Sequence, residues 1–192
     1  MIKVYGGKMS SSNRVHLLLK ELGLEYETIE LDMKNGEHKK PEFLALNPNH
    51  QIPVLVDGDL VLFESLAINQ YLCEKYRPAL LGDTIEERAH TFKWSIWQYL
   101  NLQMHFSTMA SRAWNPSVTD EQIAHAKEKV QPKLEVLEHH LEGKAFFLGD
   151  KMTVTDINTL TSFNYAMHAN YDLSKYPNIT RWYESMKTRL GA

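Results

Sequence analysis

The hydrophobic pattern of this 192-residue chain changes between residues 77 and 84, and that change limits the possible folds more than any other feature. Before it, short β-branched and aromatic runs alternate with apolar residues at helical spacing, in the order β-α-β-α-β-β-α. After it, the patterns are helical as far as the C-terminus. A shift of this kind is typical of a domain boundary. The sequence therefore predicts an α/β domain over residues 1–77, a linker over 78–84 and an all-α domain over 85–192.

The first domain is expected to contain four strands. Strand signals cover residues 2–5, 26–31, 52–56 and 60–63, and helical signals cover residues 15–22, 41–46 and 64–76. Asp57-Gly58-Asp59 lies between the last two strand signals, and this tripeptide is a strong signal for a β-hairpin.

Charge and composition exclude several classes of function. The chain carries 21 Lys and Arg against 24 Asp and Glu, a net charge of −3, without the basic surplus that nucleic-acid binding requires. No run approaches the ~20 apolar residues of a membrane span, and the N-terminus enters a strand-like run without a signal-peptide core. We therefore expect a soluble, cytoplasmic protein that binds neither nucleic acid nor membranes.

The single cysteine, Cys73, excludes a disulfide framework and a multi-cysteine metal site, and we expect it to be a structural thiol in a helix. The nine histidines do not predict a metal site either. His139 and His140 are adjacent and so diverge on a helix, and no metalloprotease-type helix pattern occurs. The histidines of the helical segments, His16 among them, are expected to be surface residues or satisfied, partly buried ones.

Three serines and an asparagine, Ser10 to Asn13, precede the first predicted helix. Serine is a favoured N-cap residue, so capping is the simplest interpretation. A hydroxyl at this position can also stabilise an anion, because the first N–H groups of a helix are unpaired and the helix dipole is positive there. The sequence alone leaves both interpretations open.

The segment from Asn47 to Val54 places Pro53 at the entry of a strand, where proline is unusual because it offers no N–H to the ladder. A cis peptide bond between Ile52 and Pro53 would turn the backbone of Ile52 outward, where it could pair with an extended peptide ligand. The alternative is an ordinary turn before a hairpin.

Glu64 and Ser65 stand where a predicted strand gives way to a helix. They could be a cap with a favourable first-turn acid. They could also bind a ligand, with Ser65 and the adjacent N–H on a carboxylate and Glu64 on an ammonium group.

Together these segments resemble the glutathione transferase family, and within it the delta and theta classes. The resemblance implies a thioredoxin-like domain followed by an all-helical domain, usually in a homodimer, with glutathione as co-substrate. The motifs that carry it are Ser10 four residues before Arg14, Gly36 to His38, Lys40 to Leu44, Asn47 to Pro53, Phe63 to Ile68, and the segment Gly149-Asp150 followed by Thr153 to Asp156, which is similar to the family's buried helix-capping box.

The resemblance also implies which residues bind glutathione. Ser10 would be the catalytic residue, donating its hydroxyl to the glutathione sulfur. The backbone of Ile52, ahead of cis-Pro53, would pair with the cysteinyl unit, and Glu64 and Ser65 would bind the γ-glutamyl end. The remaining candidates, His38 and His50 for the glycine carboxylate and Gln51 beside them, complete the set.

The electrophile is expected to bind against a long helix from Glu86 to about Arg112, which is rich in Trp and Met. Three residues of this region are the candidates for its pocket: Met104, Ser107 and Trp114. Methionine and tryptophan there suit apolar, planar substrates.

The preferred function is attack of the glutathione thiolate on an electrophilic carbon of a small apolar substrate. A glutathione-dependent peroxidase, dehalogenase or isomerase would use the same site, and a non-catalytic relative that binds a partner protein is the alternative from another class. Because Ser10 to Asn13 contain no cysteine, the reactive sulfur should arrive on the ligand.

Overall fold

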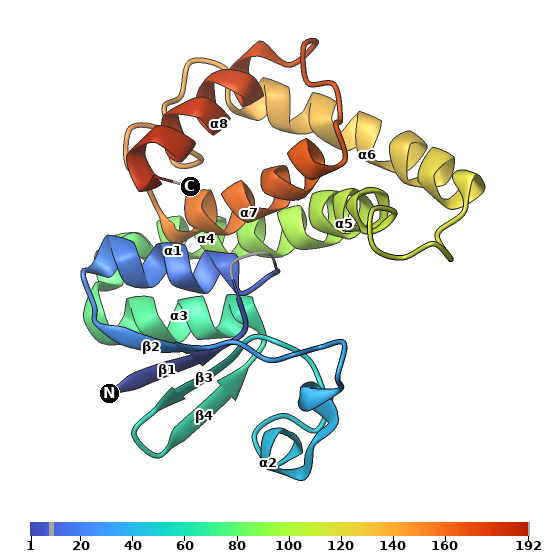
Figure 1. The fold of residues 1–192 in the computed structure, drawn as a ribbon. Coiled ribbons are helices and arrows are strands. Elements are labelled where there is room, and N and C mark those ends of the chain that lie inside the picture. The colour runs from blue at the N-terminus through green and yellow to red at the C-terminus, as the bar shows by residue number, and fades with distance from the viewer. Residues whose placement is uncertain (8–9, 192) are drawn as a thin grey trace. The chain divides into compact units, whose positions relative to one another are not determined.

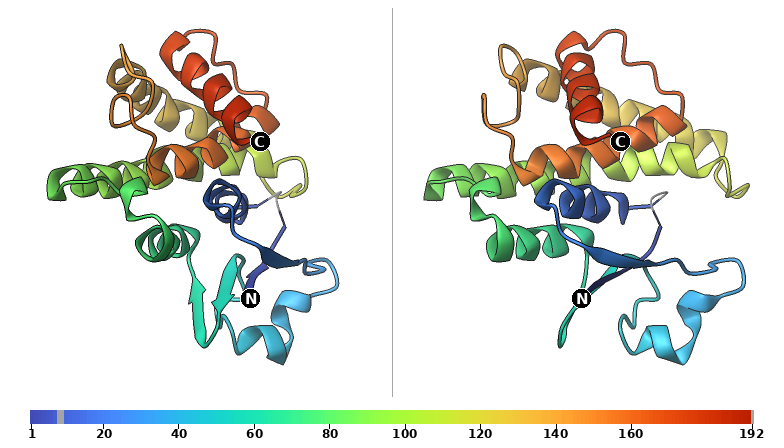
Figure 2. Two further views of the ribbon diagram at one scale, coloured as in Figure 1. Left: turned by 90° about the vertical axis from the view of Figure 1, so that its left-hand side faces the viewer. Right: turned by 60° about the vertical axis from the view of Figure 1, so that its left-hand side comes forward.

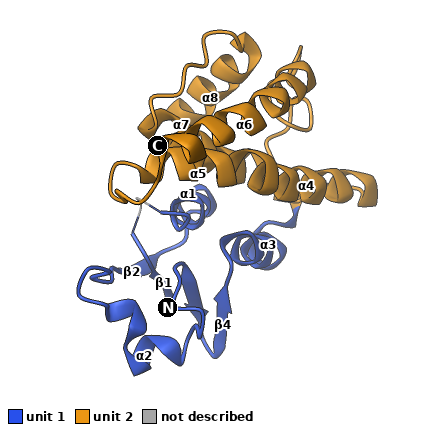
Figure 3. Cartoon of the chain, turned by 90° about the vertical axis from the view of Figure 1, so that its right-hand side faces the viewer, with its two compact units in different colours: residues 1–78 blue, residues 79–192 orange. Residues whose placement is uncertain are grey.

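A computed structural model describes residues 1–7 and 10–191 of the chain. The chain divides into two compact units, Met1–Pro78 and Ala79–Ala192 (Figure 3). The first unit is a four-stranded sheet with helices and the second is helical, so the predicted fold class, a thioredoxin-like α/β domain plus an all-α domain, is confirmed.

The sheet of the first unit has the strand order β2-β1-β3-β4 (Figure 1). Strand β1 (Ile2–Tyr5) pairs with β2 (Tyr26–Ile29) in parallel and with β3 (Val54–Asp57) in antiparallel orientation. β3 continues through the predicted hairpin into β4 (Leu60–Phe63). The second and third strands are shorter than their sequence signals, and β3 begins at Val54, directly after Ile52 and Pro53.

Helices α1 (Asn13–Leu22) and α3 (Ser65–Tyr76) cover one face of the sheet side by side (Figures 1 and 2). The buried positions alternate along β1, so Ile2 and Val4 face these helices and Tyr5 faces the other side. There its ring lies 5.9 Å from that of Phe43 in the short helix α2 (Pro41–Leu44), which follows the 3-10 turn η1 (Glu37–Lys39). A second 3-10 turn, η2, spans Pro78–Leu80.

The second unit contains α4 (Ile85–Gln98), α5 (Met104–Ser111), α6 (Asp120–His140), α7 (Val154–His168) and α8 (Pro177–Leu190). The long helix expected from Glu86 to Arg112 is interrupted by a π-helical turn, η3 (Tyr99–Gln103). A π turn inserts one residue into the helical repeat. The interruption follows a buried bond in which the Ser162 hydroxyl donates to Gln98 Oε1 (2.5 Å), a partner on α7 that periodicity could not reveal.

Helix α7 is the centre of this unit, since 11 of its 15 residues are buried. Its N-terminus is held by Asp156, whose buried carboxylate accepts hydrogen bonds from Thr153 N (2.9 Å), Phe147 N (3.0 Å) and Trp182 Nε1 (3.0 Å). Burial raises the pKa of Asp156 to about 6. The helix-capping box expected at Thr153 to Asp156 is confirmed, and its acid also ties α7 to α8 and to the loop before it.

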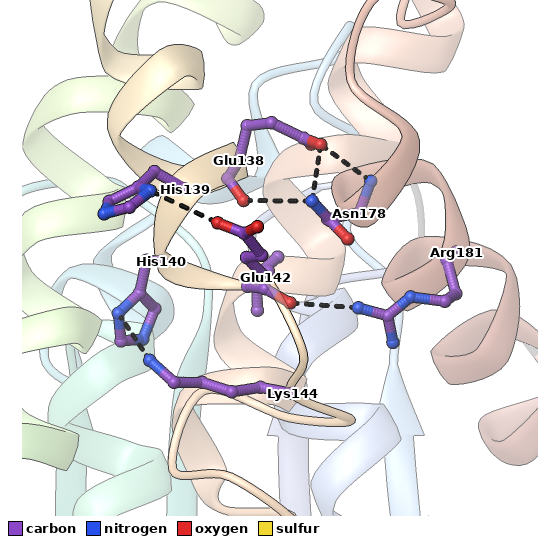
Figure 4. A network of polar contacts seen from close by, with 8 residues as sticks. Glu138, His139, His140, Glu142, Lys144, Asn178 and Arg181 are labelled. Atoms are coloured by element: carbon purple, nitrogen blue, oxygen red, sulfur yellow. Dashed lines mark hydrogen bonds and ion pairs between the residues drawn. The ribbon is translucent and has the colours of Figure 1, made fainter.

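A second carboxylate holds the start of α8 (Figure 4). Glu138 of α6 accepts from the backbone N–H groups of Asn178 (2.9 Å) and Ile179 (3.0 Å), the N-terminal residues that would otherwise lack acceptors. Arg181 of α8 donates in turn to the carbonyl of Leu141 at the end of α6 (2.9 Å). Each of the two helices therefore supplies hydrogen-bond partners to backbone groups at the end of the other.

Candidate functional site

The three motifs of the first unit lie at one edge of its sheet. In the strand register, Tyr5 is opposite Val54, and Val54 is opposite Phe63. Gly6 follows Tyr5, Pro53 precedes Val54 and Glu64 follows Phe63, so the chain segments that leave and enter these three strands meet side by side. The register therefore gathers the serine segment, the Ile52-Pro53 segment and the Glu64-Ser65 segment around one edge.

The serine segment is tied to itself and to its neighbours. Ser10 Oγ donates to the carbonyl of Gly7 (2.9 Å), accepts from Ser12 N (3.1 Å) and lies 2.9 Å from Ser12 Oγ. Ser11 Oγ donates to the carbonyl of Ile52 (3.4 Å). Ser12 is fully buried, whereas Ser10 and Ser11 are half-buried. Ser10 and Ser11 are thus the hydroxyls of this segment that retain access to a ligand.

These hydroxyls do not act as the predicted cap of α1. Ser12 occupies the N-cap position with helical backbone angles, and among the described residues no side chain caps the first turn of the helix. The capping interpretation of Ser10 to Ser12 is therefore wrong in its simple form. The interpretation in which the segment offers hydroxyls beside a helix N-terminus keeps its structural basis.

Gly6 lies at the centre of this arrangement, and sequence reasoning did not single it out. Its φ is +120°, and a Cβ built on it would lie 2.3 Å from Ser12 Oγ and 2.9 Å from Cβ of Ile52. Only glycine fits between these two side chains without displacing them. The close approach is what brings the serine and Ile52 segments together.

The peptide bond between Ile52 and Pro53 is cis, which confirms the first of the two interpretations of this proline. The preceding loop is held by Asn47, a buried residue whose Nδ2 donates to the carbonyl of Gln51 (2.7 Å) and whose Oδ1 accepts from Asn49 N (3.0 Å). Gln51 is exposed and Ile52 is half-buried. Asn47 thus fixes the segment that presents the backbone of Ile52 at the sheet edge.

Glu64 and Ser65 begin α3 in a strained conformation. Glu64 is exposed and has φ 71° and ψ 106°, a region that L residues rarely adopt, and Ser65 is buried as the first residue of the helix. Strain of this kind persists where the surrounding structure requires it, often at ligand sites. Among the described residues, no side chain caps α3. This helix terminus therefore has an acid held in place beside it and no cap of its own.

The two histidine candidates flank α2. His38 lies in the η1 turn, half-buried, and its Nδ1 is buried without a hydrogen-bond partner among the described residues. His50 is exposed, with a positive φ of 54°, in the loop that leads to Ile52. The structure places both on the chain segments that lead into the sheet edge but does not join them to it by any contact between described side chains.

The three electrophile candidates belong to the second unit. Met104 begins α5, Ser107 lies one turn later and donates its hydroxyl to the carbonyl of Met104 (3.1 Å), and Trp114 follows the helix. Met104 and Trp114 are 50% and 61% exposed, so both present apolar surface to solvent within their unit.

The described residues contain no cluster of three or more His, Cys, Asp or Glu side chains able to hold a metal ion. Cys73 is buried in α3, and burial raises the pKa of its thiol to about 12, so it remains a protonated structural side chain. Over the same described residues, none of the helices has the length and apolar character needed to cross a bilayer.

Comparison with known proteins gives one consistent result. Residues 1–74 match the family described as glutathione S-transferase, N-terminal domain, and residues 98–189 match glutathione S-transferase, C-terminal domain. Glutathione S-transferase F9 of Arabidopsis thaliana is 34% identical over 98% of this chain and 93% of its own length.

Two solved structures with different class names are equally similar to this chain. The crystal structure of glutathione transferase F7 from Populus trichocarpa superposes with a TM-score of 0.90 at 28% identity, covering 100% of this chain and 98% of its own. A delta-class glutathione transferase of Nilaparvata lugens superposes with a TM-score of 0.89 at 31% identity, covering 98% and 89%. The structural similarity is therefore not limited to the delta class. The comparisons show the family, and they do not show the assignment to the delta and theta classes that the sequence suggests.

Proposed function

The chain belongs to the glutathione S-transferase family, and on that premise we propose that its sheet edge binds glutathione with Ser10 facing the sulfur. The enzyme is a glutathione transferase, and glutathione is its co-substrate. The observation that carries the proposal for the site is the register that brings Gly6, Pro53 and Glu64 to one edge, next to two helix N-termini. The proposed site is of the serine type, as in the resemblance to the delta and theta classes.

Each part of the tripeptide has a complementary group. The backbone of Ile52, directly before cis-Pro53, pairs with the cysteinyl unit as an added strand would. Glu64 meets the ammonium and Ser65 the carboxylate of the γ-glutamyl end, at the positive terminus of α3. The glycine end of the tripeptide is bound by three residues of the segments that lead into the sheet edge: His38, His50 and Gln51.

The chemistry requires a thiolate. A free thiol with a pKa of ~8.5 is only a few per cent ionised at neutral pH, and the thiolate is the nucleophile. Lowering that pKa by about two units takes ~2.7 kcal/mol of preferential stabilisation of the charged sulfur. One charge-assisted hydrogen bond from Ser10 and the dipole of α1 together have this magnitude. Ser10 acts as an electrostatic stabiliser, and the proton of the thiol leaves to solvent.

The second unit supplies the electrophile site in this proposal. Residues 85–192 would form the electrophile domain, residues 1–77 the glutathione domain and residues 78–84 the linker between them. Within the second unit, Met104, Ser107 and Trp114 offer exposed apolar surface with one hydroxyl, which suits small apolar electrophiles.

A homodimer is the proposed assembly, and α4 with η3 offers a surface for it. Apolar side chains that recur at helical spacing along one face are solvent-exposed in the single chain: Phe92 (62%), Ile96 (37%), Tyr99 (36%) and Leu100 (52%). An unpaired apolar stripe of this kind is typical of a protein interface. Sedimentation at micromolar concentration should give a dimer, and Phe92→Glu should give a monomer. The cytoplasmic location expected from the sequence belongs to the same proposal.

The test of the site combines binding and turnover. Calorimetry with glutathione should show binding below millimolar concentration, and a panel of aryl halides, epoxides and peroxides should identify a turned-over electrophile. Absence of glutathione binding at millimolar concentration would contradict the whole proposal. Binding without turnover of any substrate would favour a non-catalytic relative.

Alanine variants of the serine segment test the catalytic role. Ser10→Ala should raise the apparent pKa of bound glutathione by about one to two units and lower conjugation at neutral pH about tenfold or more, with glutathione affinity largely retained. Ser117→Ala, in an exposed loop of the second unit, is the control and should change neither quantity. An unchanged pH–rate profile for Ser10→Ala, with a changed profile for Ser11→Ala, would move the role to Ser11.

A further inference from the structure

His16 lies inside the first unit, one turn into α1, with only 3% of its surface exposed. Its Nε2 lies 2.8 Å from the carbonyl oxygen of Gly6, and its Nδ1 lies 3.1 Å from the hydroxyl of Tyr26 on β2. A carbonyl oxygen can only accept, so Nε2 must carry a proton and donate it to Gly6. The sequence pattern predicts only a surface or satisfied histidine, and the structure shows that the ring binds the backbone carbonyl of Gly6.

Tyr26 fixes the state of the ring from the other side. Burial raises the pKa of the Tyr26 hydroxyl, so this group keeps its proton and can donate it to Nδ1. A neutral imidazole that accepts at Nδ1 must donate at Nε2, which is the nitrogen facing Gly6. The two rings lie 5.5 Å apart between centroids, close enough to hold each other's orientation. Tyr26 thus selects the tautomer that binds the Gly6 carbonyl.

Gly6 connects the hydrogen bond from His16 Nε2 to the residues of the proposed site. Its N–H donates to the carbonyl of Ile29 (2.9 Å) and its carbonyl accepts from His16, so both polar groups of the residue are fixed by α1 and β2. The same glycine lies in contact with Ser12 and Ile52, at distances that leave no room for a Cβ. Ser10 Oγ donates a hydrogen bond to the carbonyl of Gly7, the residue that follows Gly6. A movement of the Gly6 carbonyl would therefore displace the Gly6-Gly7 backbone and with it the Ser10 hydroxyl.

We propose that His16, with Tyr26 behind it, is a positioning residue for the thiolate site: by holding the Gly6 carbonyl it sets the distance between Ser10 and the glutathione sulfur. This inference rests on the proposed glutathione site and adds a residue that does not touch the ligand. Loss of the bond releases the Gly6-Gly7 backbone, and the Ser10 hydroxyl then stabilises the thiolate less well. The parts of the site that bind the ends of glutathione, at α3 and around α2, are not held by His16 and keep their affinity.

Four variants separate positioning from stability. His16→Leu removes the donor, His16→Gln restores an N–H that can reach Gly6, and Tyr26→Phe removes only the group behind the ring. Leu19→Ala is the matched control, a fully buried residue one turn further along α1 whose loss leaves a cavity without touching Gly6. For each variant, the pKa of the bound glutathione thiol is titrated by the ultraviolet absorbance of the thiolate, alongside kcat, glutathione Kd and Tm.

His16→Leu should raise the pKa of the bound thiol by about half a unit to one unit and lower kcat at neutral pH about three- to tenfold, while glutathione Kd changes less than about threefold. His16→Gln should recover most of both losses, and Tyr26→Phe should show the same direction at smaller size. Leu19→Ala should lower Tm without moving the thiol pKa.

Two results overturn the inference and are distinguishable from each other. If the unsubstituted protein binds no glutathione, or binds it without lowering the thiol pKa, the proposed site fails and His16 has nothing to position. If the unsubstituted protein lowers the thiol pKa and His16→Leu leaves it unchanged, or Leu19→Ala raises it equally, the role of His16 is structural only. Should His16→Leu not fold, Tyr26→Phe decides the same question, because an unchanged thiol pKa in that folded variant would contradict the positioning role of the His16–Tyr26 pair.

Discussion

Two helix N-termini of this protein, those of α1 and α7, use similar residues in opposite ways. Both follow a short polar segment, Ser10 to Ser12 in one case and Thr153 to Asp156 in the other. At α7 the buried Asp156 carboxylate accepts hydrogen bonds from three different parts of the helical unit. At α1 the serine hydroxyls bond to one another and to nearby backbone, and among the described residues none caps the helix.

The difference shows what makes a helix terminus available to a ligand. The carboxylate at α7 is fully buried and already accepts from three donors of its own unit, so it is not accessible to a ligand. Ser10 and Ser11 are half-buried, and a hydroxyl can rotate to a new acceptor at little cost. A ligand anion at α1 would therefore meet donors that can turn toward it and a positive dipole.

Glu64 at the start of α3 supports the same distinction. As at α1, no side chain among the described residues caps this terminus, although Glu64 differs from Ser12 in having a positive φ. In the helical unit, α4 is capped by Thr84 and α6 by the reciprocal pair Thr119 and Gln122. The N-termini of α1 and α3, without side-chain caps among the described residues, lie at the sheet edge of the proposed site, whereas α4 and α6 of the helical unit have complete caps.

The largest expected effect is the loss of the α7 cap. Asp156→Ala leaves the N–H groups of Thr153, Phe147 and Trp182 buried without their acceptor, which should lower the free energy of unfolding by about 3–5 kcal/mol. Asp150→Ala, an exposed carboxylate in the same loop, should change it by less than ~0.5 kcal/mol. Urea unfolding measures both, and equal stabilities of the two variants would contradict a structural role for Asp156.

A second prediction concerns the pH dependence of the same group. Burial raises the pKa of Asp156 from 3.8 to about 6, so the folded state holds this proton more tightly than the unfolded state. The contribution is therefore fully present below pH 3.8 and is lost as pH rises through about 6, a change of about 3 kcal/mol. Measured against Asp156→Asn, which does not titrate, the free energy of unfolding should fall over this range. A flat difference would show that the hydrogen bonds to the carboxylate fully offset the cost of burial, which contradicts the raised pKa.

Local signals made much of the fold predictable. The hairpin at Gly58, the order of strands and helices, and the capping box at Asp156 all depend on residues within a few positions of each other. The cis bond before Pro53 could be foreseen as one of two alternatives because proline at a strand entry leaves few solutions.

The remaining features depend on contacts between distant segments, and periodicity carries no information about them. His16 reads as one more polar position on a helix, and only the fold shows that Gly6 and Tyr26 lie on either side of its ring. The π turn within the predicted long helix lies next to Gln98, whose buried partner Ser162 on α7 is likewise far away in the sequence. The positive φ of Glu64 has no sequence signal, because glutamate is not one of the residue types that favour a positive φ.

Gly6 and Gly23 allow a third, smaller test of the contrast between a binding edge and a helix end. Gly6→Ala places a Cβ 2.3 Å from Ser12 Oγ. It should lower the free energy of unfolding by about 2 kcal/mol and abolish glutathione binding, measured by calorimetry. Gly23 also has a positive φ, 68°, at the end of α1, but no atom lies within 4 Å of an added Cβ. Gly23→Ala should therefore cost about 1 kcal/mol and leave glutathione affinity unchanged. Equal losses of affinity would mean that general destabilisation, not the sheet edge, controls binding.

The smallest expected effect is the most direct test of the comparison. Thr119→Ala removes a satisfied cap, in which Thr119 Oγ1 accepts from Gln122 N (3.2 Å), and should lower the free energy of unfolding by about 1 kcal/mol while glutathione conjugation is unchanged. Ser10→Ala should do the reverse, with a loss of stability below about 0.5 kcal/mol and a clear loss of conjugation, because its hydroxyl bonds within a half-buried loop and caps no helix. Chemical unfolding and steady-state kinetics on the same two variants decide the matter. If Ser10→Ala costs as much stability as Thr119→Ala and both retain full activity, the serine segment is a structural turn, and the hydroxyl that faces the sulfur must be sought elsewhere at the sheet edge.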